Sequence, residues 1–184
     1  GAQLKIFSFE FLFYAGIFFA VGEVANMAGV AMTPWITRKI GKKSTFMYSL
    51  ILLIGLSILF FFIPLTSGGY WLMMLMQVII SVITGIVSPL VWSMYADIAD
   101  YAELKFNTAS TGLIFSSSSM AQKFGGAIGG SAVTAILAAV GYSTEAGAIQ
   151  TESALVWVRA LMSFVPAAVA TASLFFISIY PLTT

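Results

Sequence analysis

The chain has no cysteine and no histidine, and only 8% of its 184 residues are charged. Without these two residue types there are no disulfides, thiolate nucleophiles, imidazole bases or commonest zinc ligands, so few enzyme chemistries remain. A soluble domain carries about 25% charged residues. Because 60% of this chain is hydrophobic and its mean hydropathy is +1.00, the composition predicts an integral membrane protein. The net charge of +1 gives no reason to expect a nucleic-acid partner.

Five stretches are long enough to cross a hydrocarbon core, which needs about 20 apolar residues per helix. Alternating patterns of the barrel type are missing, so we expect an all-α integral membrane protein, a bundle of five transmembrane helices. The expected spans cover approximately residues 11–37, 44–64, 70–95, 111–142 and 154–180. Pro89 is expected to interrupt the third span, and Pro166 the fifth.

The distribution of basic residues predicts the orientation. The segment from Arg38 to Lys43 has four basic residues in six positions, whereas loops 65–69 and 143–153 contain no lysine or arginine. Short basic loops stay in the cytoplasm, so we expect a multi-pass inner (plasma) membrane protein with its amino end outside and its carboxy end cytoplasmic. No cleavable signal peptide is visible in residues 1–9, and a chain that opens with Gly-Ala-Gln resembles a fragment or processed product.

Lys123 lies within an otherwise uncharged stretch that runs from Thr111 to Tyr142. An ammonium near the bilayer centre costs about 2.5–3.5 kcal/mol on insertion scales unless it faces protein or water. The alternative is a lysine that reaches the headgroups, but about a dozen residues, roughly 18 Å of helix, separate it from the nearer end. Ser116 and Ser119 share its helical face. Lys123 therefore needs a partner or a solvated cavity.

Glu23 is the second ionisable residue at depth, and Asn26 follows on the same helical face. Pairing of Glu23 with Lys123 across the bundle is the simplest relief for both charges. The alternative is a hydrated Glu23 near the outer boundary, because the first span exceeds the minimal length. Small-residue pairs within Gly125–Gly130 are expected to bring a neighbouring helix backbone close to Lys123.

An acidic segment follows the third span, with Asp97, Asp100 and Glu103 spaced three residues apart. If the helix continues, these carboxylates lie on one face and repel one another unless nearby cations neutralise their charge. The basic segment Arg38–Lys43 is expected on the same side of the membrane, so the two segments predict a charge network that locks or releases a cytoplasmic gate. A divalent-metal site is the alternative, although we expect neither a metal nor a cofactor.

Three motifs carry a family resemblance: residues 89–105, the run from Gly112 to Ser116, and Lys123-Phe-Gly-Gly-Ala-Ile-Gly-Gly130. Together they resemble the carboxy-terminal half of the glycoside-pentoside-hexuronide:cation symporters, the melibiose permease group of the major facilitator superfamily. The resemblance implies that the five spans correspond to helices 8 to 12 and that the amino-terminal half is absent. It implies a secondary transporter that moves a sugar or glycoside with a sodium ion or proton, with membrane lipid, the substrate and the amino-terminal half as partners.

The resemblance also implies roles for individual residues. Lys123 is expected to face the central cavity, with Ser119 and Ser88 near the sugar. The candidates for the substrate and cation cavity are Lys123, Ser119, Ser88, Glu23, Asn26, Gln122 and Trp92. The candidates for the cytoplasmic gate are Asp97, Asp100, Tyr101, Glu103, Lys105, Arg38 and Lys42.

Several alternatives stay open. Trp92 could pack against a sugar ring or anchor the membrane interface, where tryptophan is enriched. The competing function is a non-transporting membrane structural or interaction module, or a transporter remnant, because five helices do not by themselves enclose the cavity that paired repeats create. An intramembrane enzyme is the third option, and the missing histidine and cysteine argue against it.

Overall fold

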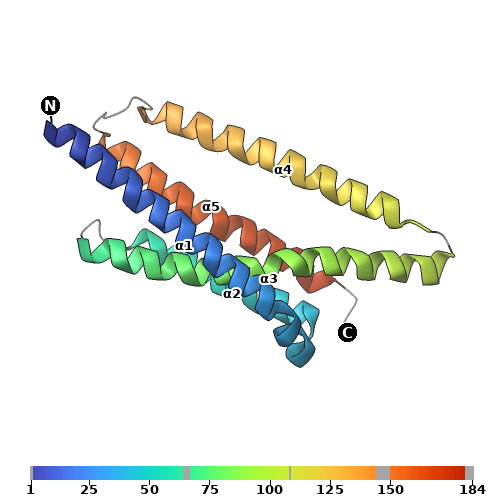
Figure 1. Cartoon of the computed structure of the whole chain (residues 1–184). Coiled ribbons are helices and arrows are strands. Elements are labelled where there is room, and N and C mark those ends of the chain that lie inside the picture. The colour runs from blue at the N-terminus through green and yellow to red at the C-terminus, as the bar shows by residue number, and fades with distance from the viewer. Residues whose placement is uncertain (1, 64–66, 108, 144–149, 181–184) are drawn as a thin grey trace.

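The computed structural model describes the backbone of residues 2–63, 67–107, 109–143 and 150–180, and the side chains from residue 16 onward apart from residues 67, 68 and 70. Within these ranges the chain forms five helices and no strand, which confirms the predicted all-α fold (Figure 1). The helices are α1 (Ala2–Ile40), α2 (Lys42–Phe61), α3 (Ser67–Phe106), α4 (Thr111–Ala139) and α5 (Glu152–Ile179).

Four of the helices are long and apolar enough to cross a membrane by length and composition: α1 from Gly16, α2, α3 from Trp71, and α5. The prediction of five spans is therefore met for four helices. Helix α4 forms where expected and has 29 residues, about 43 Å at 1.5 Å per residue, so length is not its shortfall. Its serines, glycines, glutamine and lysine interrupt its apolar residues, so α4 lacks an apolar run of the kind that each of the other four contains.

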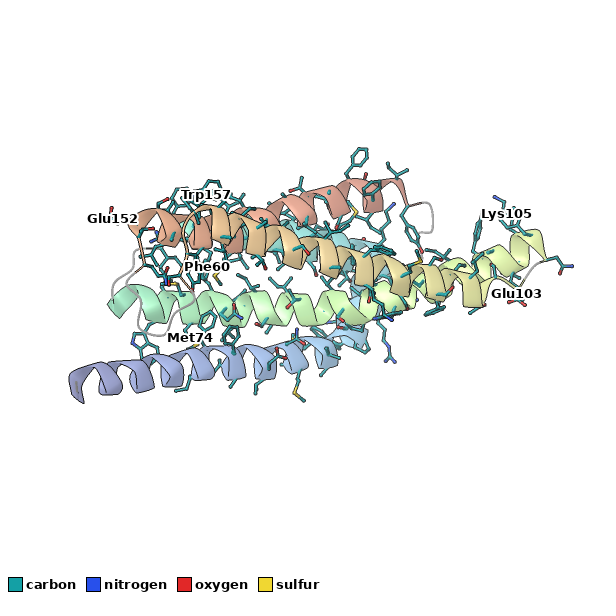
Figure 2. The ribbon with its side chains drawn as sticks, turned by 90° about the horizontal axis from the view of Figure 1, so that it is seen from above. Phe60, Met74, Glu103, Lys105, Glu152 and Trp157 are labelled. Carbon is teal, nitrogen blue, oxygen red and sulfur yellow. The ribbon has the colours of Figure 1, made fainter. Side chains whose placement is uncertain are left out.

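Helix α3 is longer than its apolar run suggests. It has 40 residues, about 60 Å, roughly twice the thickness of a hydrocarbon core. Helix α3 is continuous through Pro89, and α5 through Pro166, so neither proline ends its helix. The continuation past Trp92 places the acidic segment on the last turns of α3, which extend beyond the bundle, with Glu103 and Lys105 at the tip (Figure 2).

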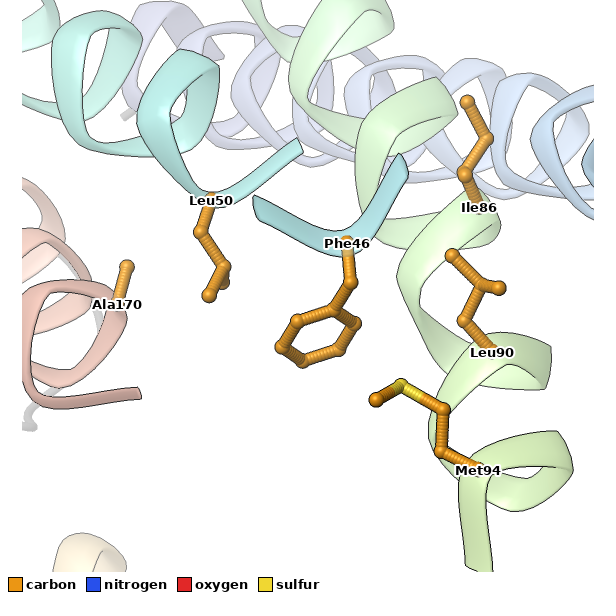
Figure 3. Close-up of a cluster of buried hydrophobic side chains, with 6 residues drawn as sticks. All are labelled: Phe46, Leu50, Ile86, Leu90, Met94 and Ala170. Atoms are coloured by element: carbon orange, nitrogen blue, oxygen red, sulfur yellow. The ribbon is translucent and has the colours of Figure 1, made fainter. Parts of the chain in front are cut away.

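The core of the bundle lies between α2, α3 and α5. Six buried side chains form it: Phe46, Leu50, Ile86, Leu90, Met94 and Ala170 (Figure 3). A smaller cluster of Phe60, Ile63 and Met76 closes the opposite end of the α2–α3 hairpin. In lipid such contacts stabilise the bundle by packing, since hydrocarbon tails are as apolar as these side chains.

Helices α1 and α3 touch backbone to backbone. A Cβ atom added to Gly29 would lie 2.0 Å from the carbonyl oxygen of Val82, and one added to Gly85 would lie 2.1 Å from the carbonyl oxygen of Asn26. Each helix therefore contributes a glycine at the point where the other helix passes. This reciprocal contact makes α1 and α3 one close-packed pair.

Helix α4 runs along the outside of the bundle (Figure 1), and among the described residues it contacts only α3 and α5. None of its side chains is buried. No atom lies within 4 Å of a Cβ added to Gly125, Gly126, Gly129 or Gly130. The prediction that these glycines bring a neighbouring helix of this chain close to Lys123 is therefore wrong for the described part of the chain.

Candidate functional site

Lys123 lies on the exposed surface of α4, next to Gln122, which is also exposed. In the described residues Lys123 makes no hydrogen bond and no ion pair. Ser119, one turn earlier, is half-buried. The structure thus keeps these candidate cavity residues together on one helix but supplies no anion for the ammonium.

Glu23 is exposed on α1 and has no ion-pair partner among the residues that the structure describes. The expected pairing of Glu23 with Lys123 is not formed, because α1 and α4 make no contact in these ranges. Both ionisable groups at depth are left on open faces of their helices.

Asn26 is engaged in packing between helices. Its amide nitrogen donates to the carbonyl oxygen of Ser81 at 3.3 Å and to the hydroxyl of Thr84 at 3.3 Å, both on α3. Thr84 in turn donates to the Ser81 carbonyl at 3.0 Å. Asn26 therefore reinforces the close contact that Gly29 and Gly85 permit.

Sequence reasoning missed the polar stripe that continues from this contact along α3. Its members are Gln77, Ser81, Thr84 and Ser88, spaced by four, three and four residues within an apolar helix. This spacing puts them on one helical face and is the pattern that could have revealed them. Of the four, only Ser88 was predicted as a site residue, and it is exposed.

A cavity of about 270 Å³ lies between α2, α3 and α5. Three polar side chains, Ser57, Gln77 and Thr84, reach its wall, and the rest of the lining is mostly apolar. Two residues of the polar stripe of α3 line it, whereas α4 contributes no residue to it. The predicted cavity residues and this cavity are therefore separate.

Trp92 packs against another aromatic side chain. Its ring stacks on Phe115 of α4 with centroids 6.1 Å apart and planes 9° apart, and Tyr95 meets both rings edge-on. This cluster joins α3 to the start of α4. The structure therefore gives Trp92 a packing role between two helices. The two roles weighed above, contact with a sugar ring and anchoring at the membrane interface, stay predictions.

At one end of the bundle, α1 ends, α2 begins and the last turns of α3 pass; we call this the basic end. Lys42 forms an ion pair there with Asp97, its Nζ atom lying 2.7 and 2.8 Å from the two carboxylate oxygens. Both side chains are about one-third exposed, at 34% and 30%. The expectation that basic residues of segment Arg38–Lys43 pair with carboxylates of the acidic segment is confirmed for Lys42 and Asp97.

The other predicted gate residues do not join that ion pair. Asp100, Glu103 and Arg38 are exposed and have no ion-pair partner in the described ranges. Lys105 instead contacts Tyr101 on its own helix, with its Nζ atom 3.0 Å from the phenol oxygen. In the same part of the chain no three carboxylates converge in a way that could hold a metal ion.

Tyr180, directly after α5, is a residue of the basic end that sequence reasoning missed. Lys43 donates to its carbonyl oxygen at 2.6 Å and to that of Ser178 at 3.3 Å, so the second lysine of α2 caps the end of α5. Burial of the phenol, and then the nearby charge of Asp97, raise the pKa of Tyr180 above its ordinary value. No pattern in the sequence marks it, because a tyrosine after an apolar span is typical of a membrane boundary.

Comparison with known proteins adds to this geometry. The family described as MFS/sugar transport protein matches residues 8–184. A glucuronide carrier protein homolog of Escherichia coli K12 is 31% identical over 172 residues, which cover 91% of this chain and 37% of that protein. An isoprimeverose transporter of Lactiplantibacillus pentosus is 33% identical over 126 residues, which cover 65% of this chain and 25% of that protein.

A third relative, named as a candidate glycoside/cation symporter of Escherichia coli K12, is 27% identical over 166 residues, which cover 90% of this chain and 35% of that protein. No solved structure matches the chain. The chain thus spans 25–37% of the length of these three relatives.

Proposed function

The chain belongs to the MFS/sugar transport protein family, and we propose that it forms the carboxy-terminal part of a secondary transporter that carries a sugar or glycoside together with a cation. The matches to a glucuronide carrier homolog and a glycoside/cation symporter candidate confirm the resemblance to the glycoside-pentoside-hexuronide:cation symporters. The name of the remaining relative, isoprimeverose transporter, likewise describes a sugar cargo. These names support a sugar or glycoside as the substrate.

The observation that carries the proposal is the open surface of α4. This helix places an unpaired lysine, Lys123, and an exposed amide, Gln122, on a face that no helix of the described chain covers. A lysine at that depth is tolerated where it faces other protein or a water-filled cavity. In transporters built from two repeats, the substrate and ion sites lie at the interface between the repeats. We assign the surface around Lys123 to that interface, with the amino-terminal half opposite.

In this arrangement Lys123 balances carboxylates of the amino-terminal half while the cation site is empty. Arrival of the cation and substrate gives those carboxylates a new partner, and the ammonium then contacts the substrate or water. This change of partners couples the two fluxes, because binding of either ligand changes the binding free energy of the other. The coupling ion is a sodium ion or proton, shared with that half, and Ser119 and Ser88 lie near the sugar.

The basic end serves as the cytoplasmic gate in the proposed transporter. The ion pair between Lys42 and Asp97 ties α2 to α3 in this conformation. The basic segment from Arg38 to Lys43 supports a cytoplasmic position for this end, with the amino end of the chain outside the inner membrane. Asp100 and Glu103, which are exposed here, remain available to basic groups of the amino-terminal half.

The test is uptake by vesicles that contain the chain joined to its amino-terminal half. Lys123→Ala is expected to reduce cation-driven uptake to the level of empty vesicles while insertion stays normal, because the interface loses its balancing charge. The matched control is Lys39→Ala, since Lys39 lies over the ring of Trp35 at 3.8 Å, away from α4. Normal substrate-driven cation flux in Lys123→Ala, measured alongside the control, refutes the assigned role.

Counterflow with a panel of labelled glycosides and pentoses identifies the substrate. The competing function, a non-transporting membrane module or transporter remnant, makes the opposite prediction for this assay. Absence of counterflow for every sugar in the panel, from a well-folded joined protein, supports that alternative.

A further inference from the structure

Two adjacent lysines at the start of α2 hold two different helices at the basic end. Lys42 binds the carboxylate of Asp97 on α3, and Lys43 binds the carbonyl oxygen of Tyr180 after α5. One turn of α2 therefore contacts both the side chain of Asp97 and the end of α5. Three helices converge on this point.

The phenol of Tyr180 has a feature that packing alone does not explain. Its ring packs against the core cluster that includes Phe46, Leu90 and Met94. Its hydroxyl is buried and has no hydrogen-bond partner in the described part of the chain. A buried hydroxyl without a partner is costly, and phenylalanine would fill the same volume without that cost. The hydroxyl thus has no use in the conformation observed.

Asp97 is the acceptor that such a hydroxyl can serve. Burial and, after it, the charge of the Asp97 carboxylate raise the pKa of the Tyr180 phenol. The phenol is protonated at neutral pH and is a hydrogen-bond donor. In this conformation Lys42 contacts both carboxylate oxygens of Asp97, at 2.7 and 2.8 Å. The Tyr180 hydroxyl makes no hydrogen bond to them.

We propose that Tyr180 is the reserve hydrogen-bond donor for Asp97, taking the carboxylate when Lys42 withdraws from it. The exchange keeps α3 tied to α5 after the tie between α3 and α2 is broken, so the basic end changes partners without leaving a half-buried charge unpaired. This proposal rests on the proposed function in one respect: the transport cycle is the event that moves Lys42 away from Asp97.

A double-mutant cycle in the intact protein, held in lipid nanodiscs, tests the exchange without any transport assay. Tyr180→Phe alone is expected to leave the thermal unfolding midpoint unchanged or slightly raised, because the hydroxyl has no partner to lose. In the Lys42→Met background the same change is expected to lower the midpoint by about 2–4 °C, the shift for loss of one hydrogen bond in a chain of this size. Tyr48→Phe is the matched control, since Tyr48 is exposed on α2.

Equal effects of Tyr180→Phe in the two backgrounds overturn the proposal. A third arm identifies the acceptor: when Asp97→Leu is added to the Lys42→Met background, the destabilisation caused by Tyr180→Phe is expected to vanish, and its persistence also overturns the assignment. If Lys42→Met does not fold, Lys42→Ala provides the same cycle, because alanine likewise has no donor for Asp97. Non-additivity together with normal coupling in Lys123→Ala would leave the exchange standing and refute the transport role of Lys123, so the two proposals fail separately.

Discussion

The α1–α3 pair and α4 use the same residue types in opposite ways. In the pair, Gly29 and Gly85 allow the two backbones to touch, and Asn26 donates across the contact. On α4, the glycines between Gly125 and Gly130 meet nothing within 4 Å, and Gln122 has no partner in the described chain. Small and polar residues are suited to helix contacts in a membrane. On α1 and α3 such residues form a contact between two helices of this chain. The same residue types are exposed on α4, so the α4 surface is suited to a contact with a helix outside this bundle.

The largest expected effect comes from closing the space at the tight contact. Gly29→Ala places a methyl group where the Val82 carbonyl oxygen would be 2.0 Å away, so the helices must separate and the Asn26 hydrogen bonds are lost. We expect the free energy of unfolding, measured by SDS titration in detergent micelles, to fall by at least about 2 kcal/mol. This substitution tests whether the α1–α3 contact holds the bundle together.

Gly126→Ala is the matched change on α4. The added methyl group meets open space within the chain, and alanine is the better helix former, so unfolding is expected to be unchanged or harder by about 0.5–1 kcal/mol. A loss of stability as large as that of Gly29→Ala would show that α4 packs as tightly as α1 and end the comparison. Loss of uptake without loss of stability would instead place a partner on the α4 surface.

The sequence predicts the helices better than their contacts. The ends of α2, α4 and α5 lie within three residues of the spans expected from hydropathy at 44–64, 111–142 and 154–180. Helices α1 and α3 run well past the expected spans, by nine or more residues at one end. Hydropathy detects the apolar run and does not detect a helix that continues past it, as α3 does through its acidic turns.

The candidate site was predictable where charge alone decides it. The ion pair between Lys42 and Asp97 follows from two oppositely charged segments on one side of the membrane. The contact of Asn26 with Ser81 depends on which helices are neighbours and on the rotation of each, neither of which composition specifies. Tyr180 was missed for the same reason, since its position beside Asp97 results from the packing of α5.

A moderate effect is expected from truncating the two amides. Asn26→Ala removes the hydrogen bonds to Ser81 and Thr84 and is expected to lower the free energy of unfolding by about 0.6–1.7 kcal/mol, the range for hydrogen bonds between membrane helices. Gln122→Ala, on the open face of α4, is expected to change it by less than about 0.5 kcal/mol. SDS unfolding of both variants measures the contrast, and equal losses would contradict it.

The smallest effect concerns the aromatic contact that attaches α4 to α3. Trp92→Leu removes the stack on Phe115, worth about 0.5–1.5 kcal/mol, yet the core between α2, α3 and α5 does not depend on it. The change should therefore appear as looser attachment of α4 and hardly at all in global unfolding.

Because the chain has no cysteine, a single Ser118→Cys on α4 reports that attachment through its rate of maleimide labelling. We expect Trp92→Leu to raise the rate by about 2- to 12-fold, the factor that this stacking energy implies for a contact that opens and closes. The control is Trp157→Leu, an exposed tryptophan on α5, which should leave the rate unchanged. An unchanged rate in Trp92→Leu would mean that contacts other than this stack attach α4 to the bundle. The α4 surface around Lys123 would then be held more firmly than its lack of buried side chains suggests.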